Sequence, residues 1–284
     1  MIEITLKRFF FSINMTFLCR QLLLPAALLL GVAQAHAGLV LHYAFDETSG
    51  TSSANSAGGG HTGTLTNMSG TEWTTGITGG GLSFDGSNDY VAIPTAAHPT
   101  GSEVSVAFWS KGEVGLAKNY FLYSEAGGRA LTVHLPYNGG VTWDVGNGGG
   151  SYDRISKSAL ASEVEGSWVH WAFTKNATTG FMNIYHNGSL WHSAGGKTMT
   201  LATSGNPISK FYIGAGGGMS HYFEGTIDDF RMYDHALSAS EVSALVAMGG
   251  GAVPEPASVF ASLGLLSAAG CGLREWRRRK KKAA

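Results

Sequence analysis

The chain has 284 residues, of which 44% are hydrophobic and 14% charged, and its formal net charge is −1. Ten of its 19 basic residues lie at the two ends, so the middle part, residues 38–253, keeps nine basic and 17 acidic residues, a net charge of about −8. This acidity argues against a nucleic-acid-binding protein, because such proteins need clustered cations to neutralise phosphates.

The N-terminal end has the pattern of a secretory signal peptide. Arg20 precedes a short apolar run, residues 22–32, and Ala35-His36-Ala37 fits a cleavage site. We therefore expect residues 1–37 to be removed on export. The pattern leaves two start codons open, Met1 and Met15.

The middle part is predicted to be all-β. Short runs rich in β-branched and aromatic residues recur along it, separated by breakers rich in Gly, Asn and Ser. Asn187-Gly188 is a strong hairpin turn, and only Ala239 to Met248 has helical spacing, with Ser238 or Ser240 as a cap. Many short strands with one short helix predict a β-sandwich or jelly roll over residues 38–248. The expected strands are 39–45, 81–84, 90–93, 104–109, 120–124, 130–135, 141–145, 168–174, 181–186, 211–214 and 225–233.

The C-terminal end carries three features in order. The triplet Pro254, Glu255 and Pro256 closes a linker over 249–256, and an apolar run of 17 residues follows, about 25 Å long as a helix and just enough to cross a thin hydrocarbon core. The basic cluster 274–282 would keep the C-terminus in the cytoplasm.

Triplet, apolar run and basic end together resemble the PEP-CTERM sorting signal of Gram-negative bacteria. The resemblance implies that residues 257–284 form a transmembrane helix with a basic cytoplasmic tail, and that an exosortase-type membrane protease cleaves near the triplet. The mature protein would then lie in the cell envelope, at the cell surface or outside the cell. The alternative is an ordinary C-terminal membrane anchor.

Five sequence blocks occur in a fixed order through the middle part. They cover residues 41–50, 82–91, 104–109, 168–188 and 225–242. Each block alone is weak, but together they resemble LamG-like, concanavalin A-like jelly-roll domains. The resemblance implies the same β-sandwich fold and the association with carbohydrate that is common among these domains.

Related jelly rolls often hold a structural or ligand-bridging Ca²⁺, and Asp46, Asp89 and Asp228 are the candidate ligands here. In the strand 225–233, period-two alternation places Asp228 on the same face as two apolar residues, and a carboxylate facing a core needs donors or a cation. Hard oxygen ligands suit Ca²⁺. The alternative is that Asp228 accepts backbone hydrogen bonds and the other two aspartates serve turns.

Catalytic residues are not expected. Laminarinase-type glycoside hydrolases share the jelly-roll architecture and carry Glu-x-Asp-x-x-Glu on one strand, a run that this sequence lacks. Glu163-Val164-Glu165 comes closest, and its neighbours suggest a loop. There is also no Gly-x-Ser-x-Gly elbow in the sequence. A jelly-roll glycoside hydrolase is the remote alternative.

Aromatic side chains near loops give the remaining functional hint. Their flat rings could stack on sugar faces or cap the ends of the sandwich. We therefore expect a non-catalytic domain that binds extracellular polysaccharide or a surface glycan; the alternative is a purely structural or adhesive display domain. The ring candidates are Trp73, Trp143, Tyr152, Trp191 and Tyr222, whereas Trp109, Trp168 and Trp171 fit the core pattern.

Overall fold

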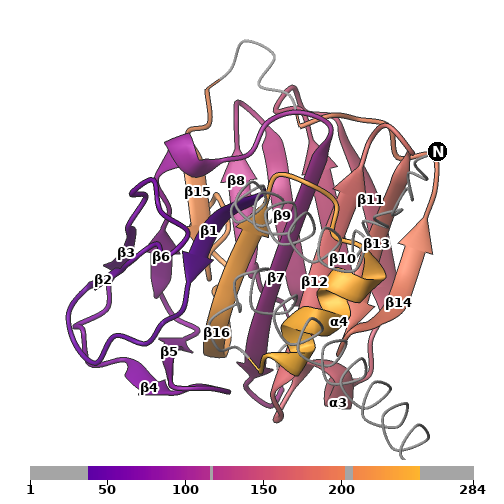
Figure 1. Cartoon of the computed structure of the whole chain (residues 1–284). Helices are drawn as coiled ribbons and strands as arrows, with labels where there is room; N and C mark the ends of the chain where they lie inside the picture. The colour runs from indigo at the N-terminus through magenta and orange to yellow at the C-terminus, as the bar shows by residue number, and fades with distance from the viewer. Residues whose placement is uncertain (1–37, 116–117, 202–206, 250–284) are drawn as a thin grey trace, which may run out of the picture. The chain divides into compact units, whose positions relative to one another are not determined.

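Two antiparallel β-sheets packed against each other make up the described part of the chain (Figure 1). The computed structural model describes residues 38–115, 118–201 and 207–249. The predicted all-β sandwich is confirmed. The predicted signal peptide, the triplet and the C-terminal apolar run lie outside the described residues.

The first sheet, sheet A, has the strand order β14-β13-β12-β7-β16-β5-β4, and β1 pairs with β16 beside this path. The long strands β7 and β16 lie at its centre (Figure 1). Its strands are β1 (Leu39–Tyr43), β4 (Trp73–Thr75), β5 (Gly80–Asp85), β7 (Glu103–Gly112), β12 (Val169–Asn176), β13 (Phe181–His186), β14 (Ser189–Ala194) and β16 (Glu224–Tyr233).

The second sheet, sheet B, has the strand order β11-β10-β9-β8-β15-β6-β3-β2. Its strands are β2 (Ser52–Ser53), β3 (Gly63–Thr66), β6 (Tyr90–Ala92), β8 (Leu122–Glu125), β9 (Arg129–Tyr137), β10 (Gly140–Gly146), β11 (Tyr152–Ser158) and β15 (Lys210–Ile213). The described helices are short: η1 (Thr95–Ala97), α3 (Ala161–Val164) and α4 (Ala239–Ala247).

The core fills the space between the two sheets. Leu131 and Val133 of β9 and Val141 and Trp143 of β10 are fully buried in one cluster with residues of sheet A such as Phe173. Because successive strand residues point to opposite faces, the residues between them point away from the core. This alternation gives sheet B a polar outer face, with Thr132 and His134 on β9 and Thr142 and Asp144 on β10.

Helix α4 covers part of the outer face of sheet A (Figure 1). Its Val242 and Leu245 form a second apolar cluster with Ala107, Ala172 and other residues of that face. The Ser238 side chain accepts a hydrogen bond from the backbone N–H of Glu241, which confirms Ser238 as the N-cap. The helix prediction is confirmed, with its end one residue earlier than expected.

Local differences from the prediction occur where the sequence signal is weak. Strands β2, β3, β4 and β11 were not expected. The first three are short, and only Ile155 of the seven residues of β11 reaches the core. Helix α3 lies where Glu163 and its neighbours suggested a loop. The Asn187-Gly188 turn is confirmed: both residues have positive φ, 48° and 81°, as a tight hairpin turn of this type requires.

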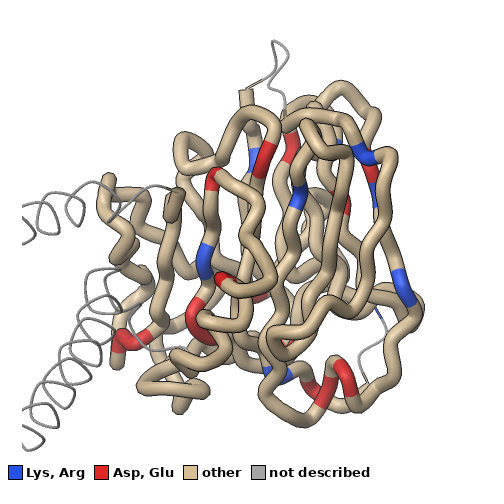
Figure 2. The backbone as a smooth tube through the Cα atoms, turned by 45° about the vertical axis from the view of Figure 1, so that its right-hand side comes forward, with Lys and Arg blue, Asp and Glu red and all other residues tan. Residues whose placement is uncertain are grey.

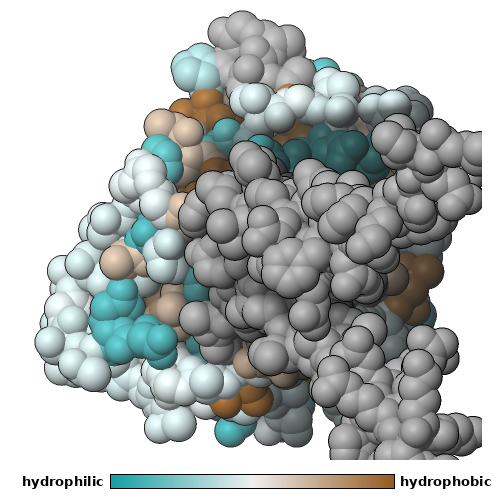
Figure 3. Space-filling model, viewed as in Figure 1, coloured by the Kyte–Doolittle hydropathy of each residue, from teal (hydrophilic) through white to brown (hydrophobic). Residues whose placement is uncertain are grey.

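In the view of Figure 3, the described residues that are not covered by grey atoms are mostly of intermediate hydropathy, with separate hydrophilic and hydrophobic areas between them. Large apolar residues that are exposed come from different elements, such as Leu160 before α3, Phe181 on β13 and Leu190 on β14. Among the described residues, no helix has both the length and the apolar content needed to span a membrane.

Candidate functional site

A cavity of about 220 Å³ lies on the outer face of sheet B. Its walls come from β9, β10 and β11 and from the segment before β8, and His134 and Thr142 lie directly opposite each other in the strand pairing. We call it the tyrosine–arginine pocket. The residues that line it are Tyr120, Arg129, His134, Tyr137, Thr142, Tyr152 and Arg154.

One buried carboxylate holds both arginines of the pocket. Asp144 is fully buried; its Oδ1 accepts a hydrogen bond from Nε of Arg154 at 2.7 Å, and its Oδ2 accepts one from Nη2 of Arg154 at 2.8 Å. Nη1 of Arg129 donates to the same Oδ2 at 2.5 Å. These bonds fix both guanidinium groups, and the bond to Asp144 raises the pKa of Arg154 above its usual range.

Tyr152 links the two arginines above the sheet. The guanidinium carbon of Arg129 lies 4.8 Å from the centroid of its ring, and that of Arg154 lies 5.2 Å from it. The tyrosine is 38% exposed, so the ring is both oriented and accessible.

Aromatic rings form the other wall of the pocket. The centroid of Tyr120 lies 4.3 Å from that of His134 and 6.1 Å from that of Tyr137. The loop 214–221 packs against this wall: a methyl group on Gly216 would lie 2.6 Å from Cδ2 of Tyr120. Only glycine permits this close approach of backbone to ring.

His134 is neutral at pH 7, because burial lowers its pKa to about 4. Its Nδ1 lies 3.2 Å from the backbone carbonyl of Asn119, which can only accept, so Nδ1 carries the proton and Nε2 is an acceptor. The pocket therefore combines cationic donors, a neutral acceptor and flat rings, a combination suited to hydroxyl-rich ligands.

The pocket lacks the acid pair of a glycoside hydrolase. None of its seven lining residues is acidic, and both oxygens of the adjacent Asp144 accept bonds from arginine. Hydrolysis of a glycosidic bond needs two carboxyl groups placed on either side of that bond. The seven lining residues therefore do not supply the two carboxyl groups that this reaction uses.

Of the aromatic residues that the sequence placed near loops, Tyr152 alone lines this pocket. Trp143 is fully buried in the core, and the indole N–H of Trp73 donates to the carbonyl of Gly50. Trp191 packs edge-on against Trp171, with 5.6 Å between ring centroids. Tyr222 is partly buried and is not among the lining residues.

Sequence reasoning missed the other six lining residues, Tyr120, Arg129, His134, Tyr137, Thr142 and Arg154. The alternation of apolar and polar residues in β9 and β10 could have shown which of their side chains point away from the core. Strand β11, however, was not predicted. The arginines meet only when β9, β10 and β11 pair.

The face assigned to Asp228 from the sequence is wrong. The register of β16 shifts between Asp228 and Arg231, and Asp229 has a φ of 53°, so a β-bulge interrupts the alternation. Ile227, Phe230 and other apolar residues of β16 therefore share the core. Asp228 lies opposite Trp109, on the outer face of sheet A.

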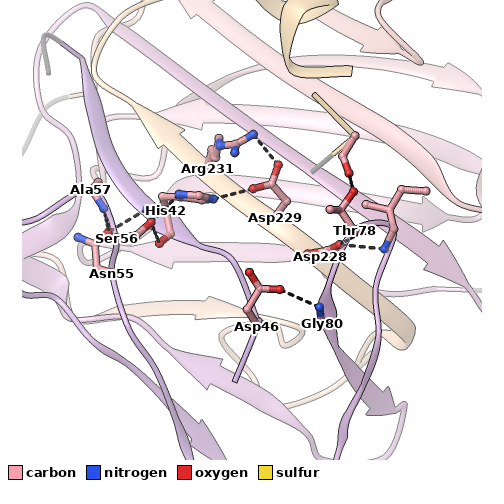
Figure 4. A network of polar contacts seen from close by, with 12 residues as sticks. His42, Asp46, Asn55, Ser56, Ala57, Thr78, Gly80, Asp228, Asp229 and Arg231 are labelled. Carbon is pink, nitrogen blue, oxygen red and sulfur yellow. Dashed lines mark hydrogen bonds and ion pairs between the residues drawn. The ribbon is translucent and has the colours of Figure 1, made fainter. Parts of the chain in front are cut away.

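The bulge creates a buried polar network on the outer face of sheet A (Figure 4). Asp229, 2% exposed, contacts Nε2 of His42 at 2.6 Å and Nη1 of Arg231 at 2.5 Å. The other ring nitrogen of His42 lies 2.5 Å from Oγ of Ser56. These bonds connect β1, β16 and the segment between β2 and β3.

Ser56, His42 and Asp229 contain the residue types of a serine-hydrolase triad, but the ring nitrogens are reversed. In hydrolases the acid bonds Nδ1 and the serine bonds Nε2; here Asp229 contacts Nε2 and Ser56 contacts Nδ1. None of the three lines the tyrosine–arginine pocket, which lies on the other sheet. We assign this chain of contacts to the stability of the fold.

Two of the three candidate Ca²⁺ ligands lie near each other. The charges of Asp46 and Asp228 interact, and burial is the main cause that raises the pKa of Asp228 to about 7. Oδ2 of Asp228 accepts backbone hydrogen bonds from Ile77 and Thr78, whereas its buried Oδ1 has no hydrogen-bond partner. A cation beside Oδ1 would satisfy that oxygen.

Asp89 does not join this pair. It lies in the turn between β5 and β6, where its Oδ2 accepts a hydrogen bond from the backbone N–H of Asp85. Among the described residues, no three His, Cys, Asp or Glu side chains gather so that they could hold a metal ion. Ca²⁺ therefore stays a proposal for Asp46 and Asp228 with backbone carbonyls and water. On sheet A it would be structural rather than ligand-bridging.

Ca²⁺ is expected to raise the melting temperature of the full chain at about pH 8, and to raise it less at about pH 5.5, because protonated Asp228 cannot act as a ligand.

Without a cation, the raised pKa of Asp228 means that the folded chain binds more protons than the unfolded chain between about pH 4 and pH 7. The free energy of unfolding therefore falls as the pH rises through this window.

Thermal melting with Ca²⁺ and with a chelator measures this effect. The Asp228→Asn variant should lose the Ca²⁺-dependent rise, and Asp89→Asn should keep it. An equal rise in Asp228→Asn would contradict the assignment, as would no rise in the unaltered chain.

The fold and the pocket together define a class of protein: a two-sheet antiparallel sandwich with a cavity of about 220 Å³ on the outer face of one sheet. A comparison of the sequence with protein families identifies one family of this class. Residues 85–243 match the model of the concanavalin A-like lectin/glucanases superfamily, and the chain belongs to this family. None of the curated proteins matches the chain.

Solved structures share this fold. Domain 4 of AbnA, an extracellular arabinanase from Geobacillus stearothermophilus solved with arabinotriose, is 23% identical with a TM-score of 0.57, covering 74% of this chain and 99% of that one. The receptor-binding domain of botulinum neurotoxin mosaic serotype C/D is 15% identical with a TM-score of 0.58, covering 75% of this chain and 51% of its own.

The ligand-binding domain of botulinum neurotoxin serotype D was solved with N-acetylneuraminic acid. It is 14% identical with a TM-score of 0.57, covering 74% of this chain and 50% of that one. The chain thus spans about half the length of the neurotoxin chains that it matches. At these identities the likeness concerns the fold.

Proposed function

We propose that this domain binds carbohydrate without cleaving it, and that the tyrosine–arginine pocket is the binding site. The observation that carries the proposal is the pocket itself: accessible tyrosine rings beside fixed guanidinium groups and a neutral histidine acceptor. Rings pack against the apolar faces of sugars, and the polar groups bond their hydroxyls.

The relatives support this proposal at the level of the fold. The arabinanase domain was solved with arabinotriose and the neurotoxin domain with N-acetylneuraminic acid, both carbohydrates. The cavity, about 220 Å³, is smaller than the roughly 300–1,000 Å³ of pockets for drug-sized ligands, and suits a short stretch of a sugar chain.

We also propose that the protein is exported and acts at the cell surface or in the extracellular matrix. This part rests on the signal-peptide pattern and on the Pro254-Glu255-Pro256 triplet, with its apolar run and basic end. An exosortase-type protease would process the C-terminus, and extracellular polysaccharide would then be the partner within reach of the pocket.

Glycan binding by the Tyr152→Ala variant tests the proposed site. The full chain is screened by calorimetry against arabinan, polygalacturonate, alginate and dextran. Loss of the ring should weaken binding of the best ligand about tenfold, as for a central aromatic contact.

Phe181→Ala is the matched control, because Phe181 is also an exposed aromatic residue but lies on β13 of sheet A. It should bind like the unaltered chain. Equal affinity in Tyr152→Ala and the unaltered chain would place the glycan elsewhere, and no binding to any of the four polymers would count against the function.

A further inference from the structure

The tyrosine–arginine pocket has an excess of positive charge on a domain that is acidic. The middle part of the chain has nine basic residues. Two of them, Arg129 and Arg154, line the pocket, and Lys118 lies with its Nζ 5.6 Å from the centroid of the lining ring Tyr137. Figure 2 shows how thinly basic positions are scattered along the backbone. A third of these cations therefore gather at one cavity.

The local charges do not cancel. Asp144 is one carboxylate between two guanidinium groups, which leaves the three side chains with a charge of +1. His134 adds no charge at pH 7, and burial raises the pKa of Tyr120, so this ring stays neutral as well. A neutral sugar would leave this positive charge without a counterpart.

The arginines keep donors for a ligand. Each guanidinium group has five N–H donors. Asp144 takes up one nitrogen of Arg129 and two of Arg154. The Arg154 side chain is 44% exposed and the Arg129 side chain 21% exposed, so both can reach a bound molecule.

Asp144 also gives the pair a fixed geometry. Because the carboxylate is fully buried and bonded to both arginines, the two guanidinium groups are held in place before any ligand arrives. Planar guanidinium groups bind carboxylates with paired, charge-assisted hydrogen bonds, and holding them in advance lowers the entropy that binding costs.

We infer that the pocket selects a carboxylate-bearing sugar, such as a uronic acid unit of an acidic extracellular polysaccharide, with Arg129 and Arg154 binding the carboxylate and the tyrosine rings packing on the sugar. This inference rests on the proposed carbohydrate-binding function and specifies its ligand class.

Matched acidic and neutral polymers test the inference. Polygalacturonate, alginate and hyaluronate are each compared with their carboxyl-reduced forms, which keep the linkages but replace the carboxylate with a primary alcohol. We expect the full chain to bind at least one acidic polymer about tenfold or more tightly than its reduced form. Added salt should weaken binding of the acidic form only.

Variants of the arginines test the assigned contacts. Arg154→Gln and Arg129→Gln should each lower affinity for the acidic polymer about tenfold. Affinity for the reduced form should fall less, about threefold at most, because a guanidinium group bonds a hydroxyl more weakly than a carboxylate. Affinity of Arg154→Lys for the acidic polymer should lie between that of Arg154→Gln and that of the unaltered chain. Lys157→Gln is the control: it removes a cation from the same strand, but Lys157 donates to the carbonyl of Trp191 and does not line the pocket. Melting curves show that each variant is folded.

The outcomes separate the two proposals. Equal binding of acidic and reduced polymers, lost in Tyr152→Ala, would overturn the selection of carboxylates and leave the carbohydrate site standing. A preference for acid that survives Arg154→Gln and Arg129→Gln would overturn the assigned contacts. No binding to any form by folded protein would count against the proposed function itself.

Discussion

Replacing Asp229 with Asn is expected to lower the free energy of unfolding by about 3–5 kcal/mol, which is a large part of the stability of a typical domain. Asp229 and Arg231 are both almost fully buried, and the substitution removes the negative charge that balances Arg231 and bonds His42. Asn tolerates the positive φ of this bulge position. The loss of stability can therefore be attributed to the missing charge and not to backbone strain. Chemical denaturation followed by circular dichroism measures it.

Two further variants make this prediction specific. Asp234→Asn changes an exposed aspartate just beyond the same strand and should alter stability by less than about 0.5 kcal/mol. The double variant Asp229→Asn with Arg231→Met removes both charges and keeps a residue that tolerates the positive φ. It should recover part of the loss, because no buried charge is then left without its counter-charge. A loss below about 1 kcal/mol in Asp229→Asn would show that the network is not a main support of the fold.

Trp143→Ala is expected to cost about 3–5 kcal/mol of stability, the usual effect of removing a large buried aromatic side chain. The ring is fully buried, its centroid lies 5.8 Å from that of Phe173, and its indole N–H donates to the carbonyl of Thr174. The substitution would leave a cavity between the sheets and an unpaired acceptor.

Tyr152→Ala provides the contrast for this prediction. Tyr152 starts the neighbouring strand, but its side chain is exposed, so its loss should change stability by less than about 1 kcal/mol while weakening glycan binding. Denaturation of both variants separates the roles. Similar stability losses would contradict the assignment of one ring to the core and the other to the site.

The contrast between Trp143 and Tyr152 shows which burial states could be predicted from the sequence. Val141, Trp143 and Val145 alternate with polar residues, which is sufficient to place Trp143 in the core. The expected strand 141–145 already included this residue. Trp143 was nevertheless placed among the aromatic residues near loops, and the alternation was the better guide.

Features that depend on pairing between distant strands could not be predicted. The bulge at Asp228 and Asp229 arises from the register of β16 against β7, and no local sequence pattern predicts it. Strand β11 has too few apolar residues to be recognised, yet it supplies Tyr152 and Arg154 to the pocket. The eleven expected strands, helix α4 and the Asn187-Gly188 turn were predictable because they follow from local periodicity and turn chemistry.

The most direct test of the account is a crystal structure of the protein with an acidic oligosaccharide, such as an oligogalacturonate. We predict electron density for the sugar on the outer face of sheet B, with a sugar ring against Tyr152 and the carboxylate within hydrogen-bond distance of Arg154. Density for the sugar on another surface, such as sheet A beside Asp46 and Asp228, with the tyrosine–arginine pocket empty, would contradict the account.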